Sequence, residues 1–316
     1  MSASTSTPND PRLLFTGPSP FGGHRYALAA MCLRRYGLDY EDNPLPTRDA
    51  NGNLIAFVRE AEDADPEASA WELIRGTMVH TGLAHFYARR RAQQRKDSAT
   101  LDLLYEPVEA MRVLHEQERD RAHLGDRESW DNALIVGERV MLDYAKRYAF
   151  EKARVEIVEE VFSLELGDNK APYTFRLDLG IRDSAGKVWM VDHKTTTRLR
   201  PDHGWSYGIS VQFQAYAVGG RAIYGEDYGG VMANMIECPE PDDPKPVTTF
   251  DRPRMPGVAG FLTGFPARIS DIYGRLVALV QSGLPPSLWP KNPGVHSCRS
   301  YGRVCPYYDR CSTSPD

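Results

Sequence analysis

The feature that most constrains the fold of this chain is a run of three predicted β-strands near its middle. Alternating side chains, many of them β-branched or aromatic, predict strands at 154–165, 173–182 and 187–194. A four-residue loop, Asp183-Ser184-Ala185-Gly186, joins the second strand to the third as a hairpin. We therefore expect a sheet built around this hairpin.

Helical periodicity surrounds the three strands on both sides. The predicted helices cover about 22–37, 71–96, 102–121, 128–150, 208–223 and 257–282, and a further strand is predicted at 229–238. No internal repeat is visible. The order of elements predicts an α/β core preceded by a helical region.

Composition divides the chain into four segments. Residues 1–20 are rich in Pro, Ser and Thr and are expected to form a disordered lead, and 21–150 form a mainly helical region. Residues 151–282 hold the predicted strands, and 283–316 form a tail rich in Pro, Cys and Tyr. We expect the chemistry in the third segment, with the tail in a separate role.

Charge and hydropathy exclude several classes of protein. The chain of 316 residues is 41% hydrophobic and 26% charged, with a formal net charge of −5 and a pI of about 5.9. A passive DNA-coating protein is usually basic, because neutralising phosphates supplies its affinity. There is no long apolar run and no signal peptide at the N-terminus. We expect no membrane association and a cytoplasmic location, in a bacterial or phage-infected cell.

Two acids and a lysine converge on the predicted hairpin. Asp178 lies on its first strand, and Asp192 and Lys194 lie near the end of the second, two residues apart and hence on one face. Two carboxylates can hold Mg²⁺ or Mn²⁺, and the main-chain carbonyl of His193 could add a ligand. The ion would activate a water for phosphodiester hydrolysis, with the lysine orienting that water.

A plainer interpretation is a surface hairpin with a salt bridge, since Asp-x-Lys is common by chance. Against it, Asp178 lies between Leu177 and Leu179, and Asp192 follows an apolar stretch. An acid inside an apolar strand is costly unless it is coordinated or paired. These residues alone leave both interpretations open.

The hairpin residues belong to a set of four motifs. In chain order they are Gly76-x-x-x-His80, Asp178, Asp192-x-Lys194 and Gln212-x-x-x-Tyr216. Each is weak alone, but together they resemble the nuclease domain of the RecB-like exonuclease family within the PD-(D/E)XK superfamily. The resemblance implies a restriction-endonuclease-like core, with a mixed central sheet flanked by helices.

The resemblance also implies roles for these residues. His80 would be a metal ligand beside the two aspartates, and Gln212 and Tyr216 would line the site on the DNA side. The implied activity is a metal-dependent DNA exonuclease in recombination, repair or replication. Its expected partners are DNA ends or single strands, and a recombination or replication partner protein stays open. Two alternatives stay open: a non-cleaving DNA-binding or scaffold subunit, and a CRISPR-type spacer-processing nuclease.

Cysteines gather in the tail. Five are present, an odd number that argues against a disulfide framework, and three of them are Cys298, Cys305 and Cys311. With Cys32 as a fourth ligand, they resemble the iron–sulfur variants of the same family, such as AddB-type nucleases, which bind a [4Fe–4S] cluster. Zinc in the same cage, or free thiols, remain alternatives. Cys238, on a predicted strand, is expected to be a small core residue.

Cationic residues near the hairpin are candidates for phosphate contacts. Arg198 and Arg200 follow Lys194 closely, and a basic run at 89–96 forms the end of the predicted His80 helix. The basic run could equally be a solvated helix end, because cations are favoured at helix C-termini. No base-reading module is recognisable, so little sequence specificity is expected. His85 does not fit the His80 motif and is expected to be structural.

Overall fold

A computed structural model describes most of the chain. The described residues are 10–14, 19, 21–42, 44–46, 71–122, 124–200, 207, 210–243, 249–255, 259–292, 298–300 and 303–312. The disordered lead predicted for residues 1–20 therefore lies mostly outside them. No helix in the described ranges is long and apolar enough to cross a membrane.

The chain forms two compact units that interleave along the sequence. Unit 1 comprises residues 1–18, 58–161 and 176–258, and unit 2 comprises 19–57, 162–175 and 259–316. The four-segment division expected from composition follows the chain in order and stays a prediction.

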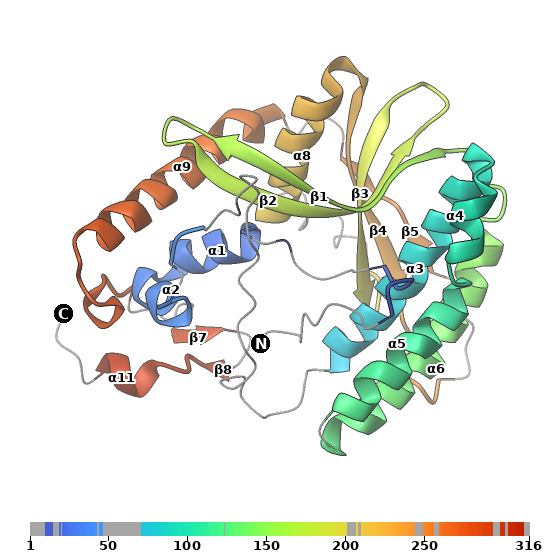
Figure 1. The fold of residues 1–316 in the computed structure, drawn as a ribbon, viewed down its shortest axis with the longest axis horizontal. Helices are drawn as coiled ribbons and strands as arrows, with labels where there is room; N and C mark the ends of the chain where they lie inside the picture. The colour runs from blue at the N-terminus through green and yellow to red at the C-terminus, as the bar shows by residue number, and fades with distance from the viewer. Residues whose placement is uncertain are drawn as a thin grey trace. The chain divides into compact units, whose positions relative to one another are not determined.

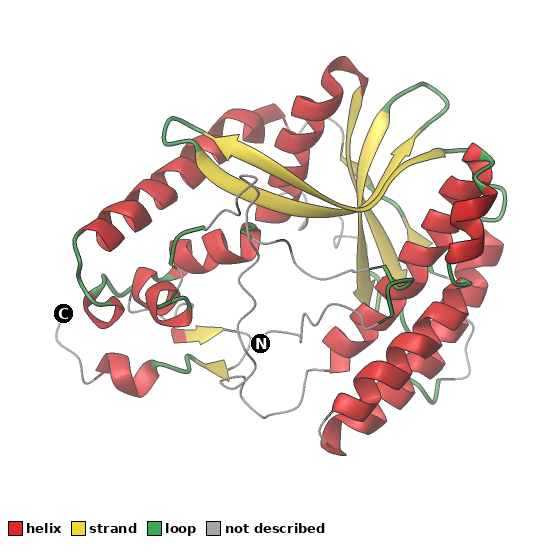
Figure 2. Cartoon of the chain, viewed as in Figure 1, coloured by secondary structure: helices red, strands yellow, loops and turns green. Residues whose placement is uncertain are grey.

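Unit 1 contains five helices among its described residues. They are α3 (Trp71–Arg95), α4 (Ser98–Leu103), α5 (Pro107–Arg121), α6 (Leu124–Arg147) and α8 (Val211–Tyr224). The helices α3, α5 and α6 pack against one another, as Figures 1 and 2 show. Gly82 of α3 permits this close approach, because a Cβ there would lie 2.8 Å from Met141 Cγ.

The single helix predicted over 102–121 is wrong, because the structure divides this stretch between α4 and α5. Pro107 is the first residue of α5. Proline lacks an N–H and its ring clashes with the preceding turn, so it starts a helix and does not continue one. Asp97 caps α4 by accepting a hydrogen bond from the Thr100 N–H.

The strands build a mixed sheet in the order β1-β2-β3-β4-β5, with β6 paired to β4. Their bounds are β1 (Arg154–Leu166), β2 (Ala171–Arg182), β3 (Val188–Thr196), β4 (Tyr228–Glu237), β5 (Phe250–Asp251) and β6 (Arg254–Met255). The pair β2–β3 is antiparallel, whereas β3–β4 is parallel. Parallel neighbours need a crossover connection, and α8 supplies it. The predicted mixed sheet with flanking helices is confirmed.

The predicted hairpin between β2 and β3 is present. The Asp183 N–H donates to the Lys187 carbonyl at 2.9 Å, and the Gly186 N–H donates to the Asp183 carbonyl at 3.0 Å. Gly186 has φ +81°, a conformation that glycine adopts without steric cost. The hairpin brings β3 beside β2 in the middle of the sheet.

The core of unit 1 lies between α3, α6 and the sheet. Its fully buried members include Met78 and Val79 of α3, Val140 of α6 and Val191 of β3. Cys238 is also fully buried in this cluster, which confirms its prediction as a core residue. Burial of this apolar surface holds α3 against the strand that carries the predicted catalytic residues.

The described elements of unit 2 are mainly helical. They are α1 (Gly23–Met31), α2 (Leu33–Asp39), α9 (Ala259–Gln281), the short 3₁₀ turn η3 (Pro286–Leu288), the strands β7 (Arg299–Ser300) and β8 (Arg303–Val304), and α11 (Tyr308–Ser312). The single helix predicted over 22–37 is wrong. Cys32 separates α1 from α2 with an extended backbone, and the Arg34 N–H of α2 donates to the Pro290 carbonyl.

Candidate active site in unit 1

The two predicted aspartates meet where the β2–β3 ladder ends. The antiparallel register pairs Leu179 with Val191, and the next residues toward the end are Asp178 and Asp192. There the His193 N–H donates to Asp178 Oδ2 at 2.8 Å. The Asp178 carboxylate thus satisfies a backbone group at the point where the strands part. The hairpin therefore brings both acids together, as its short loop predicts.

Asp192 is 1% exposed and is enclosed by hydrogen-bond donors. Its Oδ1 accepts from Gln212 Nε2 at 2.7 Å and from the Tyr216 hydroxyl at 2.8 Å, and both donors lie on α8. Its Oδ2 forms an ion pair with Lys194 Nζ at 2.5 Å. Lys194 also donates to Gln212 Oε1 at 2.9 Å, which closes a ring of four side chains.

Helix α3 brings His80 to the same end of the sheet. Its Nδ1 lies 3.6 Å from Asp178 Oδ2. The imidazole of His80 also forms a hydrogen bond with the main chain of His193. Gly76, one turn earlier on α3, faces Thr195 of β3, whose Oγ1 would lie 3.4 Å from an added Cβ. The predicted Gly-x-x-x-His spacing thus places a small residue and an imidazole on the face that meets β3.

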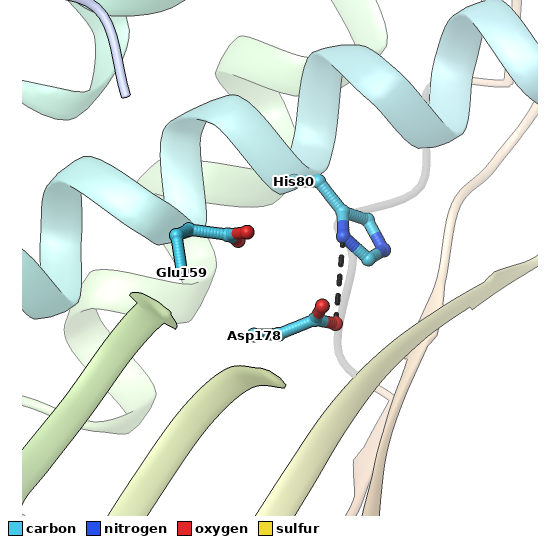
Figure 3. A group of neighbouring side chains, drawn as sticks. All are labelled: His80, Glu159 and Asp178. Atoms are coloured by element: carbon cyan, nitrogen blue, oxygen red, sulfur yellow. Dashed lines mark ion pairs between the residues drawn. The ribbon is translucent and has the colours of Figure 1, made fainter. Parts of the chain in front are cut away.

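Glu159 of β1 joins this group and was missed by the sequence interpretation. One ligand atom each of His80, Glu159 and Asp178 lies within 4.8 Å of the others, and the three side chains point toward one another in Figure 3. Both carboxylate oxygens of Glu159 lack a hydrogen-bond partner among the described residues. Arg176 Nη1 donates to the main-chain carbonyl of Glu159 at 3.1 Å, not to its carboxylate.

The backbone explains why Glu159 turns inward. Its φ is +50°, and the two residues before it, Ile157 and Val158, are both buried. Two consecutive buried residues break the alternation of β1, so the side chain of Glu159 leaves the face that a regular strand would give it. The local signal in the sequence is the adjacent apolar pair Ile157-Val158, where alternation fails just before Glu159.

The site holds more negative charge than its surroundings stabilise. Burial, and then the charge of Asp192, raises the pKa of Asp178 to about 8. Burial, and then the charge of Asp178, raises the pKa of Glu159 well above its usual range. Burial lowers the pKa of His80 to about 4, so its ring is neutral at neutral pH and free to act as a ligand.

Lys194 is the cation that pairs with Asp192, and Arg176 is a second cation near Glu159 and Asp178. Burial alone would lower the pKa of Lys194, but Asp192 and Asp178 outweigh burial and raise it, so the ammonium stays charged. It lies 5.6 Å from the ring centroid of Tyr207. Lys194 and Arg176 carry two positive charges against the three carboxylates of Asp178, Asp192 and Glu159.

A divalent cation fits this donor set. The unpartnered oxygens of Glu159, an oxygen of Asp178 and the neutral ring of His80 are suitable ligands for Mn²⁺, and the oxygens suit Mg²⁺. Asp192 is not part of the group of three. Its Oδ1 accepts from Gln212 and Tyr216, and its Oδ2 forms the ion pair with Lys194.

Other predicted residues lie around this centre. Arg198 and Arg200 are exposed just beyond β3. In the basic run, Arg89 donates to the Leu104 carbonyl at 2.7 Å and Arg91 to Glu160 at 2.8 Å. These contacts within unit 1 favour a structural role for that part of the run. His85 is fully buried, and its Nε2 accepts from the Leu14 N–H at 3.2 Å, as expected for a structural histidine.

The predicted cluster cysteines all belong to unit 2. Cys32 is buried at the junction of α1 and α2, and the Cys305 N–H donates to the Cys298 carbonyl at 2.8 Å. Burial raises the pKa of the Cys305 thiol, and the neighbouring Cys311 adds to this. In the described ranges, the only group of three or more His, Cys, Asp or Glu side chains with ligand atoms within 4.8 Å of one another is the group that contains His80.

Two comparisons bear on this site. No curated protein matches the sequence. A family model described as the PD-(D/E)XK nuclease superfamily matches residues 24–312, which include every element of the site. Because the match extends over most of the chain, and the acids, the lysine and the mixed sheet agree with it, the protein belongs to the PD-(D/E)XK nuclease superfamily.

Proposed function

We propose that this chain is a Mg²⁺- or Mn²⁺-dependent DNA exonuclease of the RecB-like type, acting in recombination, repair or replication. Members of the superfamily are metal-dependent nucleases, and their fold implies DNA as substrate. The observation that carries the proposal is the convergence of His80, Glu159 and Asp178 beside the Asp192–Lys194 pair. The RecB-like assignment rests on the order of the sequence motifs.

His80, Glu159 and Asp178 would hold the metal ion. Asp192 would join them when its ion pair with Lys194 opens, and the His193 carbonyl is a further candidate ligand. When bound, the ion supplies Lewis-acid polarisation of the scissile phosphate and a water of lowered pKa.

Lys194 acts beside the metal ligands. Its ammonium has three N–H donors, and Asp192 and Gln212 accept two of them. The remaining donor is available to orient the attacking water and to stabilise charge that develops on the phosphate. Because Lys194 stays charged through the neutral range, this role needs no proton uptake.

Gln212 and Tyr216 hold the carboxylate of Asp192 in place. Gln212 Nε2 also donates to the Tyr216 hydroxyl at 2.9 Å, so the two side chains brace each other one helical turn apart. Burial raises the pKa of Tyr216 well above its usual range, so its hydroxyl remains a donor. On the DNA side, the exposed Arg198 and Arg200 would contact phosphates.

A cleavage assay on labelled single- and double-stranded DNA, with Mn²⁺ or Mg²⁺ and with EDTA, tests the proposal. We expect metal-dependent release of nucleotides from ends by wild type. Lys194→Met should lower the rate about a hundredfold or more, the loss typical of removing one positioned transition-state donor. Asp192→Asn and Glu159→Gln should also be strongly impaired.

Asp227→Asn is the matched control, because Asp227 is an exposed acid of the same unit and, among the described residues, its side chain pairs with Arg182. It should cleave like wild type. DNA binding by wild type without cleavage in either metal would contradict the proposal and support a non-cleaving subunit. Full activity of Asp192→Asn would place the chemistry elsewhere.

We also propose that Cys32, Cys298, Cys305 and Cys311 bind a [4Fe–4S] cluster. The support is that all four belong to one compact unit, that Cys298 and Cys305 are linked through their main chains, and that Cys311 lies near Cys305. Thiolates are the usual ligands of such clusters.

Anaerobic purification tests the cluster. Wild type should be brown and contain iron and acid-labile sulfide in equal amounts, and Cys311→Ser should lose most of both. Cys238→Ala is the control, because Cys238 lies in the core of unit 1 and should not affect the cluster. Colourless protein with stoichiometric zinc would show that the same thiols hold zinc instead.

A further inference from the structure

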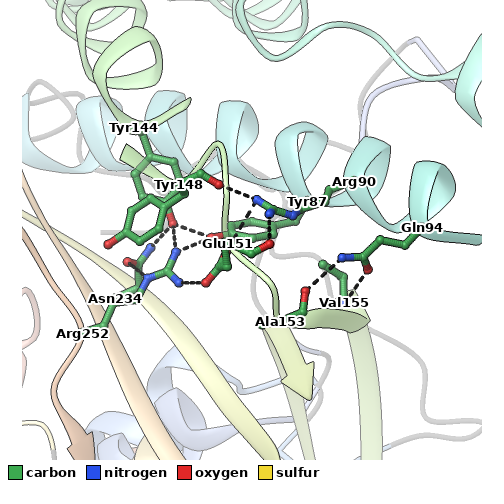
Figure 4. Close-up of polar contacts among 10 residues, drawn as sticks. All are labelled: Tyr87, Arg90, Gln94, Tyr144, Tyr148, Glu151, Ala153, Val155, Asn234 and Arg252. Carbon is green, nitrogen blue, oxygen red and sulfur yellow. Dashed lines mark hydrogen bonds and ion pairs between the residues drawn. The ribbon is translucent and has the colours of Figure 1, made fainter. Parts of the chain in front are cut away.

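A buried polar network lies behind the candidate active site and takes no direct part in it. Its centre is Arg252, between β5 and β6, whose side chain reaches Glu151, Tyr87, Tyr144 and Asn234 (Figure 4). The guanidinium also stacks over Tyr148 at 3.6 Å from the ring centroid. The Arg252 side chain is 12% exposed, and its fixed partners are more than pairing its charge with Glu151 requires.

The hydrogen bonds of this network run in one direction. The Tyr144 hydroxyl accepts from Arg252 at 2.6 Å and from Asn234 Nδ2 at 2.8 Å, so its own proton points to the Tyr87 hydroxyl, 2.7 Å away. Tyr87 also accepts from Arg252, so its proton points to Glu151 Oε2 at 3.4 Å. Each hydroxyl thus donates one hydrogen bond and accepts two.

The same count of donors and acceptors fixes the orientation of the Asn234 amide. Its Oδ1 accepts from Arg252 Nε at 2.9 Å, so its Nδ2 must face Tyr144 and His193. Asn234 lies opposite His193 in the parallel β3–β4 register, and its Nδ2 is 2.7 Å from His193 Nδ1. His193 Nδ1 is therefore an acceptor, and the neutral ring carries its proton on Nε2.

His193 connects this network to the metal ligands. It lies between Asp192 and Lys194 on β3, and its N–H holds Asp178. Its ring stacks on Tyr87 at a centroid distance of 5.8 Å and meets His80 edge-on at 5.7 Å. Tyr87 and His80 are seven residues apart on α3, two turns along one face. The imidazole of His193 is thus packed between α3 and β3, the elements that carry His80 and Asp192.

We infer that Arg252 is a positioning residue of the metal centre, acting through Asn234 and His193. Arg252 orients the Asn234 amide, Asn234 holds the His193 ring in one tautomer, and the ring sets the spacing of α3 from β3. This inference rests on the proposed function, because it presupposes that His80, Glu159 and Asp178 bind a metal ion. Partners that orient metal ligands indirectly typically change metal affinity by about 10- to 100-fold when they are removed.

Two variants test the inference. Arg252→Lys keeps the charge but lacks the planar fork that reaches Asn234 and both tyrosines. Asn234→Asp keeps the shape but removes the donor to His193 Nδ1. Each should weaken Mn²⁺ binding, measured by electron paramagnetic resonance, by about 10- to 100-fold. In ¹⁵N-histidine spectra of metal-free protein, wild type should show the Nε2–H tautomer of His193, and Asn234→Asp should lose it.

Two controls separate positioning from stability. Val136→Ala removes core volume in α6 without touching the network, so it should lower stability and leave Mn²⁺ affinity unchanged. Arg119→Lys removes the fork of an arginine that pairs with Asp131, outside the network, and should behave like wild type. Loss of Mn²⁺ affinity in Val136→Ala equal to that in Arg252→Lys would reduce the role of Arg252 to general stability and overturn the inference.

The results distinguish this inference from the proposed function. Wild-type Mn²⁺ affinity in both Arg252→Lys and Asn234→Asp, with DNA cleavage by wild type, would overturn the positioning role alone. Weakened Mn²⁺ binding in both variants, without DNA cleavage by wild type, would overturn the nuclease proposal alone. No Mn²⁺ binding by wild type would overturn both.

Discussion

Glu159 has a backbone conformation that few residues of its type adopt. A φ of +50° costs a non-glycine residue on the order of 1 kcal/mol or more, and its side chain then lies buried beside Asp178 without a hydrogen-bond partner among the described residues. Both features are unfavourable in the metal-free chain. A bound cation would offset both costs, because its attraction to the Glu159 carboxylate would stabilise the conformation that turns this side chain inward.

Asp178 should make metal-free protein less stable as pH rises from 6.5 to 8. Its folded pKa is about 8 and its ordinary value is 3.8, so over this window the folded state holds a proton that the unfolded state has lost. Stability that depends on this proton is present at low pH and is lost as pH rises through 8. At about 1.4 kcal/mol per proton and pH unit, we expect a loss of roughly 1–2 kcal/mol.

Urea unfolding in EDTA at several pH values measures this loss. Folded His80, with a pKa of about 4, is uncharged throughout the window, whereas its unfolded imidazole, with an ordinary pKa of 6.5, still binds protons near pH 6.5. His80 therefore opposes the loss at the lower end of the window and not near pH 8. In Asp178→Asn the slope should become flatter by the contribution of Asp178, and the raised pKa of Glu159 should leave a remaining slope. In wild type with Mn²⁺ the stabilisation by metal should grow over the same range, because the ion competes with protons. A slope in Asp178→Asn equal to that of wild type would contradict the assignment.

Helix α3 combines two tasks that compete for space. One face carries His80 toward the sheet, and Gly82 faces α5 and α6, where an added Cβ would lie 2.8 Å from Met141 Cγ and 3.0 Å from Met111 Sδ. A helix that holds a ligand must not shift by even a fraction of an ångström under packing strain. The glycine therefore keeps α3 close to α6 and in register with β3.

Gly82→Ala should destabilise unit 1. Overpacking typically costs about 1–3 kcal/mol. That cost exceeds the gain of about 0.5–1 kcal/mol from replacing glycine inside a helix. The free energy of unfolding should therefore fall, as measured with urea.

Gly264→Ala is the matched control for this change. Gly264 lies in α9, and a Cβ there meets nothing within 4 Å, so the same substitution should stabilise the protein slightly. Equal effects of the two substitutions would show that helix propensity, not close packing, determines the result at Gly82.

Elements were predictable where periodicity alone decides them. The strands β1 to β3 agree with their predicted positions to within about two residues, because alternation and the hairpin loop are local properties. Helix breaks were harder. Pro107 is a local signal that the periodic pattern concealed, whereas the break at Cys32 coincides with a hydrogen bond from Arg34 to Pro290, far along the chain.

In the candidate site too, residues placed by local sequence were predictable, and residues placed by distant parts of the chain were not. Asp178, Asp192 and Lys194 follow from two strands and one turn, so their meeting could be predicted from spacing. His80 needed a family resemblance, because nothing local tells α3 which strand it will face. Glu159 and Arg252 could not be predicted, since one depends on a break in alternation and the other on partners from several distant elements.

The interleaving of the two units has a consequence for biosynthesis. Unit 1 can complete its core once residue 258 has left the ribosome. In unit 2, α1 packs against α9 and α2 against η3, both of which are translated long after them. Nascent domains fold when all their parts are available. The first helices must therefore wait, with their apolar faces uncovered, while the nuclease unit folds between them and their partners. A chaperone that binds nascent chains would find its target there, in α1 and α2.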